Sequence, residues 1–317
     1  MGFRKVIGFG DSSYVVSLPK EWVVKNGIKK GDVMSVSDDD EVTLKLTPQN
    51  VVPKKTPSDI KIEFKNIKYL KSQLVYTYVS NYDTITITGS ELSKYIIDIR
   101  NEVKNFVALE LIQYGDKSVI LKDYLDIRNI SVYDTIRRID RIIISMAEGV
   151  GNMMQTYKLD NYEEIKSKEG DINKLSNLIF KILKRSFNPV DRNILKLTLD
   201  DIFYYWELTL FLEKFADQIK RIPKYCKDLK PNEDLLRIYN NILDQYNLAM
   251  KANYTKSVDL AADVMAKKGA TFKECDVLTA SLTKDYSYVL EKIRNMNSHT
   301  GNISKVLLKL HRPINES

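Results

Sequence analysis

The chain has 317 residues, of which 44% are hydrophobic and 29% are charged, and its net charge is +7. This composition excludes an intrinsically disordered chain, and the length suggests about two domains. No apolar run reaches the roughly 18–20 residues that a membrane-spanning helix needs, and the first residues lack the pattern of a signal peptide. The two cysteines, Cys226 and Cys275, lie far apart, so we expect a reduced, cytoplasmic protein without membrane insertion.

Residues 1–48 predict a small β-rich unit. Strands are expected at 3–9, 14–18, 32–37 and 42–47, and a short helix at 20–26. Pro19 ends the second strand and opens the helix, and Gly27 takes the left-handed position after it. Asp38–Asp40 are expected to form the turn between the last two strands. Such a small unit cannot bury enough surface to be stable alone, so a second copy is expected to complete its sheet.

Charge is unevenly distributed along this unit. Residues 1–30 hold six basic side chains against two acids, and residues 31–41 hold five acids. A polarised unit of this kind can present one face to a polyanion. A mixed solvated surface explains the same pattern equally well.

The order of features in residues 2–48 carries a resemblance. The segments "RKV", "YVVSLPKEW" and "NGIKKGD", with a serine-rich loop and a closing hairpin, resemble the AbrB/SpoVT-type swapped-hairpin DNA-binding domain in its archaeal variety. The resemblance implies an intertwined homodimer, a dimeric β-barrel, whose basic strands and loops lie on DNA. The DNA contacts that we predict from it lie on the first strand, the following loop and the short helix: Arg4, Lys5, Ser12, Ser13, Tyr14, Lys20 and Lys25.

The short helix departs from the pattern of bacterial members. They often place a dibasic pair there, where this chain has Val23 and Val24. Lysine and arginine near phosphates would make a salt-dependent contribution that positions the protein without reading sequence. The alternative is a dimerisation module that has lost DNA binding.

The next part of the chain predicts a linker and a small α/β module. Residues 48–59 hold three of the eight prolines and no periodic pattern, and we place a linker at 49–59. The module, at 60–128, predicts helices at 70–79 and 90–103 and strands at 83–89, 106–112 and 118–124. Ser90 is the expected N-cap of its second helix. The module has no histidine and no cluster of nucleophile and base, so we expect a structural or oligomerisation role.

From 129 to 317, apolar residues recur with a period of 3.6, which predicts an all-α bundle. Breaks expected at 158–161, 188–189, 222–233, 252–254 and 268–269 give about six helices. Two apolar stripes match at an offset of 81 residues: Leu208, Leu212, Phe215, Ile219 and Ile222 align with Val289, Ile293, Met296, Thr300 and Ile303. We infer two copies of a three-helix unit, at about 131–222 and 233–311.

The helical part carries a second resemblance. The segments "ISVYDTIRRIDRIIISM" (130–146), "EGDINKLSNLIFKIL" (169–183) and "LEKFADQIKRI" (212–222) resemble the PhoU family of phosphate-uptake regulators, which are two three-helix bundles in tandem. The whole chain is similar to the archaeal AbrB–PhoU fusion regulators. This resemblance implies a carboxylate pair on the third helix that can hold a divalent or iron-type metal ion. Glu213 and Asp217 match that pair, and three further acids could complete the site: Glu169, Asp171 and Asp140.

Two interpretations of the acidic pair stay open. Carboxylates four residues apart share one helix face, which suits a surface metal site and equally suits two solvated acids. The second repeat departs from the pattern, because it has Arg294 and Ser298 at the equivalent positions, or Glu291 and Asn295 at an offset of 78. The remaining conspicuous side chains are expected in surface or packing roles: His299, His311, Trp22 and Trp206.

Three functions fit parts of this pattern. The first is a DNA-binding transcriptional regulator of phosphate uptake, in which the N-terminal dimer contacts DNA and the helical domain senses or relays phosphate status. The second is an adaptor that binds a phosphate transporter or signalling partner and uses the N-terminal unit only to dimerise. The third, a metalloenzyme, is disfavoured because the chain has no paired Glu-x-x-His motif, P-loop, dinucleotide fingerprint or nucleophile constellation. We expect a regulator and not an enzyme.

Overall fold

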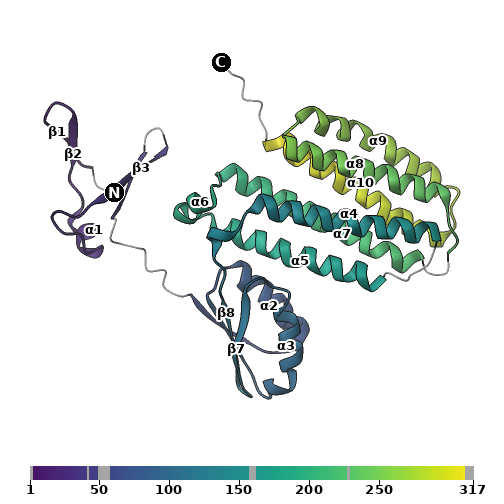
Figure 1. Ribbon diagram of the computed structural model, residues 1–317, viewed down its shortest axis with the longest axis horizontal. Helices are drawn as coiled ribbons and strands as arrows, with labels where there is room; N and C mark the ends of the chain where they lie inside the picture. The colour runs from purple at the N-terminus through teal and green to yellow at the C-terminus, as the bar shows by residue number, and fades with distance from the viewer. Residues whose placement is uncertain (1–2, 41–42, 49–57, 157–161, 227–228, 311–317) are drawn as a thin grey trace. The chain divides into compact units, whose positions relative to one another are not determined.

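The computed structural model describes residues 3–40, 43–48, 58–156, 162–226 and 229–310. The chain divides into two compact units, Met1–Thr56 and Pro57–Ser317 (Figure 1). Most of the predicted linker lies outside the described residues, but Asp59 already begins a strand. The boundary expected at 128/129, inside the second unit, stays a prediction.

The N-terminal unit contains two antiparallel hairpins and a short helix. The hairpins pair β1 (Val6–Phe9) with β2 (Ser13–Val16) and β3 (Met34–Asp40) with β4 (Thr43–Pro48). α1 (Lys20–Lys25) starts after Pro19, and Gly27 follows it at a φ of +65°, as the sequence predicted. Two details differ from prediction. Arg4 and Lys5 precede β1, and the three acids at 38–40 belong to β3 because Asp38 and Asp40 still pair across the hairpin with β4.

The second unit begins with a four-stranded mixed sheet of order β5-β6-β8-β7. Its elements are β5 (Asp59–Glu63), α2 (Ile67–Val79), β6 (Thr84–Thr88), the 3-10 turn η1 (Leu92–Tyr95), α3 (Ile96–Val103), β7 (Leu109–Tyr114) and β8 (Ser118–Asp123). β5 and β6 are parallel and joined by α2, whereas β8 is antiparallel to both of its neighbours. One face of the sheet packs with α2 and α3 in a small core of its own.

Three predictions for this module were wrong. β5 was missed because its short alternation, with Ile60 intermediate and Ile62 buried, stands next to the proline-rich linker. Ser90 caps no helix, since Glu91, at a φ of +56°, precedes η1 without a side-chain cap. β7 begins at Leu109 and not at 106, because the chain first turns through Ala108 at a φ of +58°.

A short 3-10 turn, η2 (Ile127–Asn129), leads into the helical bundle. Its described residues form six long helices and one short one: α4 (Val132–Thr156), α5 (Tyr162–Arg185), α6 (Pro189–Leu195), α7 (Leu199–Cys226), α8 (Glu233–Thr255), α9 (Val258–Thr279) and α10 (Lys284–Leu310). The break at 188–189 is confirmed, because the Asn188 side chain caps α6 and Pro189 stands in its first turn.

Two expected helix breaks were misplaced. α8 continues past 252–254 and ends at Thr255, where Lys256 takes a left-handed φ of +55°. α9 runs without interruption through Lys268 and Gly269, and the chain reverses only after Thr279. One glycine inside a helix costs only about 1 kcal/mol relative to alanine, which a packed helix tolerates.

The long helices form two mutually packed sets. α4, α5 and α7 contact one another, as do α8, α9 and α10, and the sets meet where α7 packs on α10 and α4 on α8 (Figure 1). The two matched stripes are confirmed as core, because all ten of their residues are buried. Within the described ranges, no helix combines the length and the apolarity needed to cross a membrane.

Candidate functional site

The seven predicted DNA-contact residues are all exposed, but they do not form one cluster within the chain. Ser13 and Tyr14, which were predicted to lie in the loop, already belong to β2. Val6 pairs with Val16 and Phe9 with Ser13, so the Arg4–Lys5 pair and Ser12, in the turn, lie at opposite ends of the first hairpin. At about 3.4 Å per residue, the strands separate these ends by roughly 10–14 Å. Lys20 and Lys25 occupy the two ends of α1.

The N-terminal unit also exposes its apolar side chains. Among the side chains that the structure describes in 3–48, none is buried. The large exposed ones come from the N-terminus, α1, the loop after it and both hairpins: Phe3, Val6, Ile7, Phe9, Tyr14, Val15, Val16, Val24, Val33, Val36, Leu44 and Leu46. Monomeric proteins rarely leave so many large apolar side chains uncovered in so short a segment, and exposed apolar surface is typical of an interaction site.

The acidic pair of the bundle lies on α7, beside a third carboxylate from α5. Burial raises the pKa of Glu213, and the nearby charges of Glu169 and Asp217 raise it further. Lys220 lies between the other two acids, with its Nζ 2.7 Å from Glu169 Oε1 and 3.7 Å from Asp217 Oδ1. Arg221 Nη2 lies 2.7 Å from Asp217 Oδ2. Two of the three carboxylates are therefore already neutralised by protein cations.

This arrangement does not fit a bound metal ion as the side chains stand. A divalent site needs several oxygen ligands free to converge on one point, whereas an ammonium occupies the position between Glu169 and Asp217. Across the part of the chain that the structure describes, no group of three or more His, Cys, Asp or Glu side chains is arranged to hold a metal ion. Asp171 is exposed on α5, two residues and about 200° around the helix from Glu169.

Asp140, the last predicted ligand, belongs to a different contact. Its Oδ1 accepts a hydrogen bond from the Tyr246 hydroxyl at 2.8 Å, and its Oδ2 accepts one from Tyr254 at 2.6 Å. Burial raises the pKa of Asp140, although the two tyrosines and nearby arginines oppose that change. Tyr246 also stacks on Phe215, with ring centroids 4.4 Å apart. Asp140 therefore joins α4 to α8 and leaves the Glu213 cluster incomplete.

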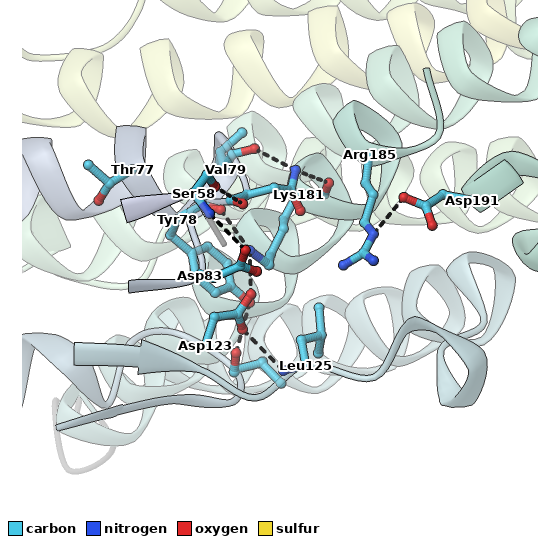
Figure 2. Close-up of polar contacts among 12 residues, drawn as sticks. Ser58, Thr77, Tyr78, Val79, Asp83, Asp123, Leu125, Lys181, Arg185 and Asp191 are labelled. Carbon is cyan, nitrogen blue, oxygen red and sulfur yellow. Dashed lines mark hydrogen bonds and ion pairs between the residues drawn. The ribbon is translucent and has the colours of Figure 1, made fainter. Parts of the chain in front are cut away.

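The most buried charged contact joins the α/β module to the bundle (Figure 2). Lys181 of α5 is fully buried, and its Nζ lies 2.9 Å from Asp123 Oδ2 at the end of β8. The same ammonium donates to the Tyr78 carbonyl at 3.0 Å and lies 4.5 Å from the centre of the Tyr78 ring. Asp123 Oδ1 in turn accepts the backbone N–H of Leu125 at 3.1 Å. A buried ammonium needs such partners, because its desolvation costs several kcal/mol.

Further hydrogen bonds follow the same seam, which we define as the contact of α5 with α2, α3 and the ends of the module's strands. Asn81 donates to the Lys181 carbonyl at 3.1 Å, and Lys184 donates to Ser80 Oγ at 2.9 Å. Lys174 reaches the Lys104 carbonyl at 2.7 Å. This seam was not predicted from the sequence. Its one local signal is a lysine at position 181, three residues after Leu178, on an otherwise apolar helix face.

A family model describes the first part of the chain. The model for "Antidote-toxin recognition MazE, bacterial antitoxin" matches residues 9–54. The N-terminal unit carries a MazE/AbrB-like domain. No curated protein matches the chain. The match covers both hairpins apart from the first part of β1, and it does not extend to the α/β module or the bundle.

The MazE/AbrB-like domain accounts for both features of residues 3–48. Domains of this kind fit dimerisation and nucleic-acid binding. The exposed apolar strands supply a surface that a second chain can cover, and the exposed basic residues remain available to phosphates. The domain therefore suggests a DNA-binding or antitoxin-type regulator.

Proposed function

We propose that the protein is a DNA-binding transcriptional regulator that acts as a homodimer through residues 1–48. The observation that carries this proposal is the MazE/AbrB-like domain, which has exposed basic side chains and buries none of its described apolar ones. Covering those strands with a second copy would remove apolar surface from water at about 25 cal/mol per Å². The dimer would then present two sets of basic residues to one duplex.

The distance between the two ends of the first hairpin suggests that each end contacts a different part of the DNA. In a dimer, two copies of the Arg4–Lys5 pair and two copies of the turn end of the hairpin, at Ser12, Ser13 and Tyr14, supply four points of contact. Each lysine or arginine near a phosphate releases counterions, so affinity should fall steeply with salt. Ser12 and Ser13 can donate hydrogen bonds to phosphate oxygens, which fix the register of a protein on DNA.

We propose further that the helical bundle senses or relays phosphate status, as a PhoU-like domain. Two mutually packed sets of three helices, with buried stripes 81 residues apart, support this assignment. No step of the proposal runs through a metal ion, since Lys220 and Arg221 already pair with the acids that would bind it. The buried seam ties the bundle to the α/β module and gives a rigid path for a relayed signal within residues 58–310.

Fluorescence anisotropy of the full chain with labelled promoter DNA, at about 50 and 200 mM salt, tests the DNA-binding proposal. We expect affinity to drop at least about tenfold over that range, because several phosphates are neutralised. Arg4→Ala/Lys5→Ala should weaken binding and flatten the salt dependence. Lys29→Ala/Lys30→Ala removes the same charge from the loop after α1 and should have the smaller effect. Binding that is absent, or insensitive to salt, would overturn the proposal.

The main alternative keeps the dimer and replaces DNA with a protein partner. It is favoured by the name of the matching family model, which refers to recognition of a toxin by an antitoxin. In this case the chain would act as an adaptor for a protein such as a phosphate transporter or signalling component. Light scattering would then show a dimer that retains no DNA at low salt, and the partner would co-purify with the full chain but not with a dimer-breaking variant.

A further inference from the structure

An open pocket lies on the seam, away from the buried Lys181. Its volume is about 420 Å³, and its walls come from α3, the turn after it, β7 and Lys174 of α5. Pockets that hold small ligands span roughly 300–1,000 Å³, so this one is large enough for a compact metabolite. Because it lies where the α/β module meets the bundle, a ligand there would contact both.

The walls of this pocket are fixed by contacts outside it. The turn into β7 passes through Ala108, whose φ of +58° is uncommon for a residue with a side chain. The Tyr124 N–H donates to the Ala108 carbonyl at 2.8 Å, and the Tyr78 hydroxyl donates to the Val107 carbonyl at 3.0 Å. Strained backbone persists only where its surroundings hold it, and such positions cluster at ligand sites. The pocket is therefore formed before a ligand arrives.

The charged lining of the pocket is mainly basic. Arg100, Lys104 and Lys174 line it, opposed by Glu110. Within the described ranges, none of the three cations makes an ion pair. Lys174 gives one hydrogen bond to the Lys104 carbonyl, and an ammonium has three donors. The site therefore offers cationic donors to an anion, and Glu110 disfavours a densely charged polyanion.

The floor of the same pocket is apolar. Val103, Phe106 and Leu109 line it and are themselves only 6%, 4% and 4% exposed, because they belong to the core of the α/β module. An inorganic ion would meet the cations alone and would leave the small exposed edges of these three side chains uncovered. A ligand with a compact apolar part would cover it while its anionic group meets the lysines and the arginine.

We propose that this seam pocket binds a small organic anion in which a phosphate or carboxylate group is joined to a compact apolar part. The anionic group pairs with Arg100, Lys104 and Lys174, and the apolar part rests on Val103, Phe106 and Leu109. Lys174 is the residue that connects the ligand to α5, so binding strengthens the contact between module and bundle. The proposal does not depend on DNA binding, and its test uses no DNA.

Isothermal titration of the full chain with phenyl phosphate measures this directly. We expect one binding site per chain. Inorganic phosphate supplies only the anionic group and phenol only the apolar ring, so each should bind at least about tenfold more weakly than phenyl phosphate. Lys174→Gln and Arg100→Gln should each weaken phenyl phosphate binding about tenfold, the usual scale of a charged hydrogen bond. Lys166→Gln is the matched control, because Lys166 is exposed on the same helix and lies outside the pocket.

Three results would overturn the proposal. They are no binding of phenyl phosphate or benzoate up to about 10 mM, unchanged affinity in both pocket variants, or equal affinity for inorganic and phenyl phosphate. Among the described residues, Arg100 forms no hydrogen bond or ion pair with α5, and its guanidinium lies over the Tyr114 ring, so its variant separates lost binding from a loosened seam. A thermal scan of each variant without ligand confirms that it is folded. If phenyl phosphate does not bind, the DNA-binding proposal still stands or falls on the anisotropy experiment alone. A failure to bind DNA likewise leaves the pocket proposal untouched.

Discussion

Residues 3–48 bury none of their described side chains, whereas residues 58–310 contain two cores that hold most of the chain's isoleucine and leucine. The sequence patterns of the two regions are equally regular, with a period of two in the first and of 3.6 in the bundle. The two regions differ in where the surface that covers their apolar side chains comes from. In the bundle, the apolar faces of the helices pack against one another. A hairpin unit of this size has no second apolar layer within the same chain to pack against.

Mutations in the two units should therefore affect two different properties, the stability of the fold and the self-association of the chain. Mutations in the second unit should lower the free energy of unfolding of that unit and leave self-association intact. Mutations in the exposed strands should change the concentration at which chains associate and leave the second unit folded. Each of the following variants tests this distinction.

Phe215→Ala should have the largest effect. Phe215 is fully buried on α7 and stacks on Tyr246, so its removal leaves a cavity between the two helix sets. Truncations of this type cost about 3–5 kcal/mol. Urea denaturation followed by circular dichroism should show the loss, while light scattering should show the oligomer unchanged. A matched truncation at the exposed Phe203, on the same helix, should cost much less.

Lys181→Met should come next, with a loss of about 3 kcal/mol, because it leaves Asp123 buried without the ammonium beside it. Adding Asp123→Asn removes the uncompensated charge and should restore more than half of the lost stability. Lys166→Met, at an exposed position on the same helix and outside the seam, is the control. If the double variant is no more stable than the single one, the ion pair does not hold the seam.

Ile7→Asp tests the other half of the comparison. Ile7 is 61% exposed on β1, and covering such a side chain in a dimer is worth about 2 kcal/mol per copy. The charged variant should therefore raise the dimer dissociation constant at least about tenfold, measured by analytical ultracentrifugation. Lys30→Asp, an exposed change in the same unit, should leave the constant within a few-fold. An unchanged dimer in Ile7→Asp would show that the exposed strands do not form the interface.

The smallest effect is a pH dependence from His299. Burial and the charge of Lys214 lower the pKa of His299 to about 4, below its ordinary value of 6.5. The folded state therefore binds this proton less readily than the unfolded state, so stability is present above pH 6.5 and is lost as pH falls toward 4. After allowing for solvent screening, we expect the loss to be about 1–2 kcal/mol. Unfolding free energies at several pH values should show a flatter profile in His299→Asn.

The acidic site predicted from the sequence agrees with the structure only in part. Glu213 and Asp217 do lie on one face of α7, because a spacing of four fixes that in any helix. Asp140 was named as a further possible ligand, and in the structure both of its oxygens accept hydrogen bonds from tyrosines more than a hundred positions away. Lys220 and Arg221 were overlooked as partners, although their spacings of three and four from Asp217 were visible in the sequence.

Most of the helices and strands, the boundaries at Pro19 and Asn188, and the buried stripes of α7 and α10 could be predicted from the sequence alone. These features depend on neighbours within about four positions, where propensity and periodicity act. Packing between distant elements, by contrast, is what makes β5 complete a sheet, brings Lys181 to Asp123, and opens a basic pocket on the seam. Tyr78 and Lys181 are 103 positions apart, and no local pattern encodes such a pairing. It follows from how whole elements pack, because a buried charge is stable only where the fold brings its partner.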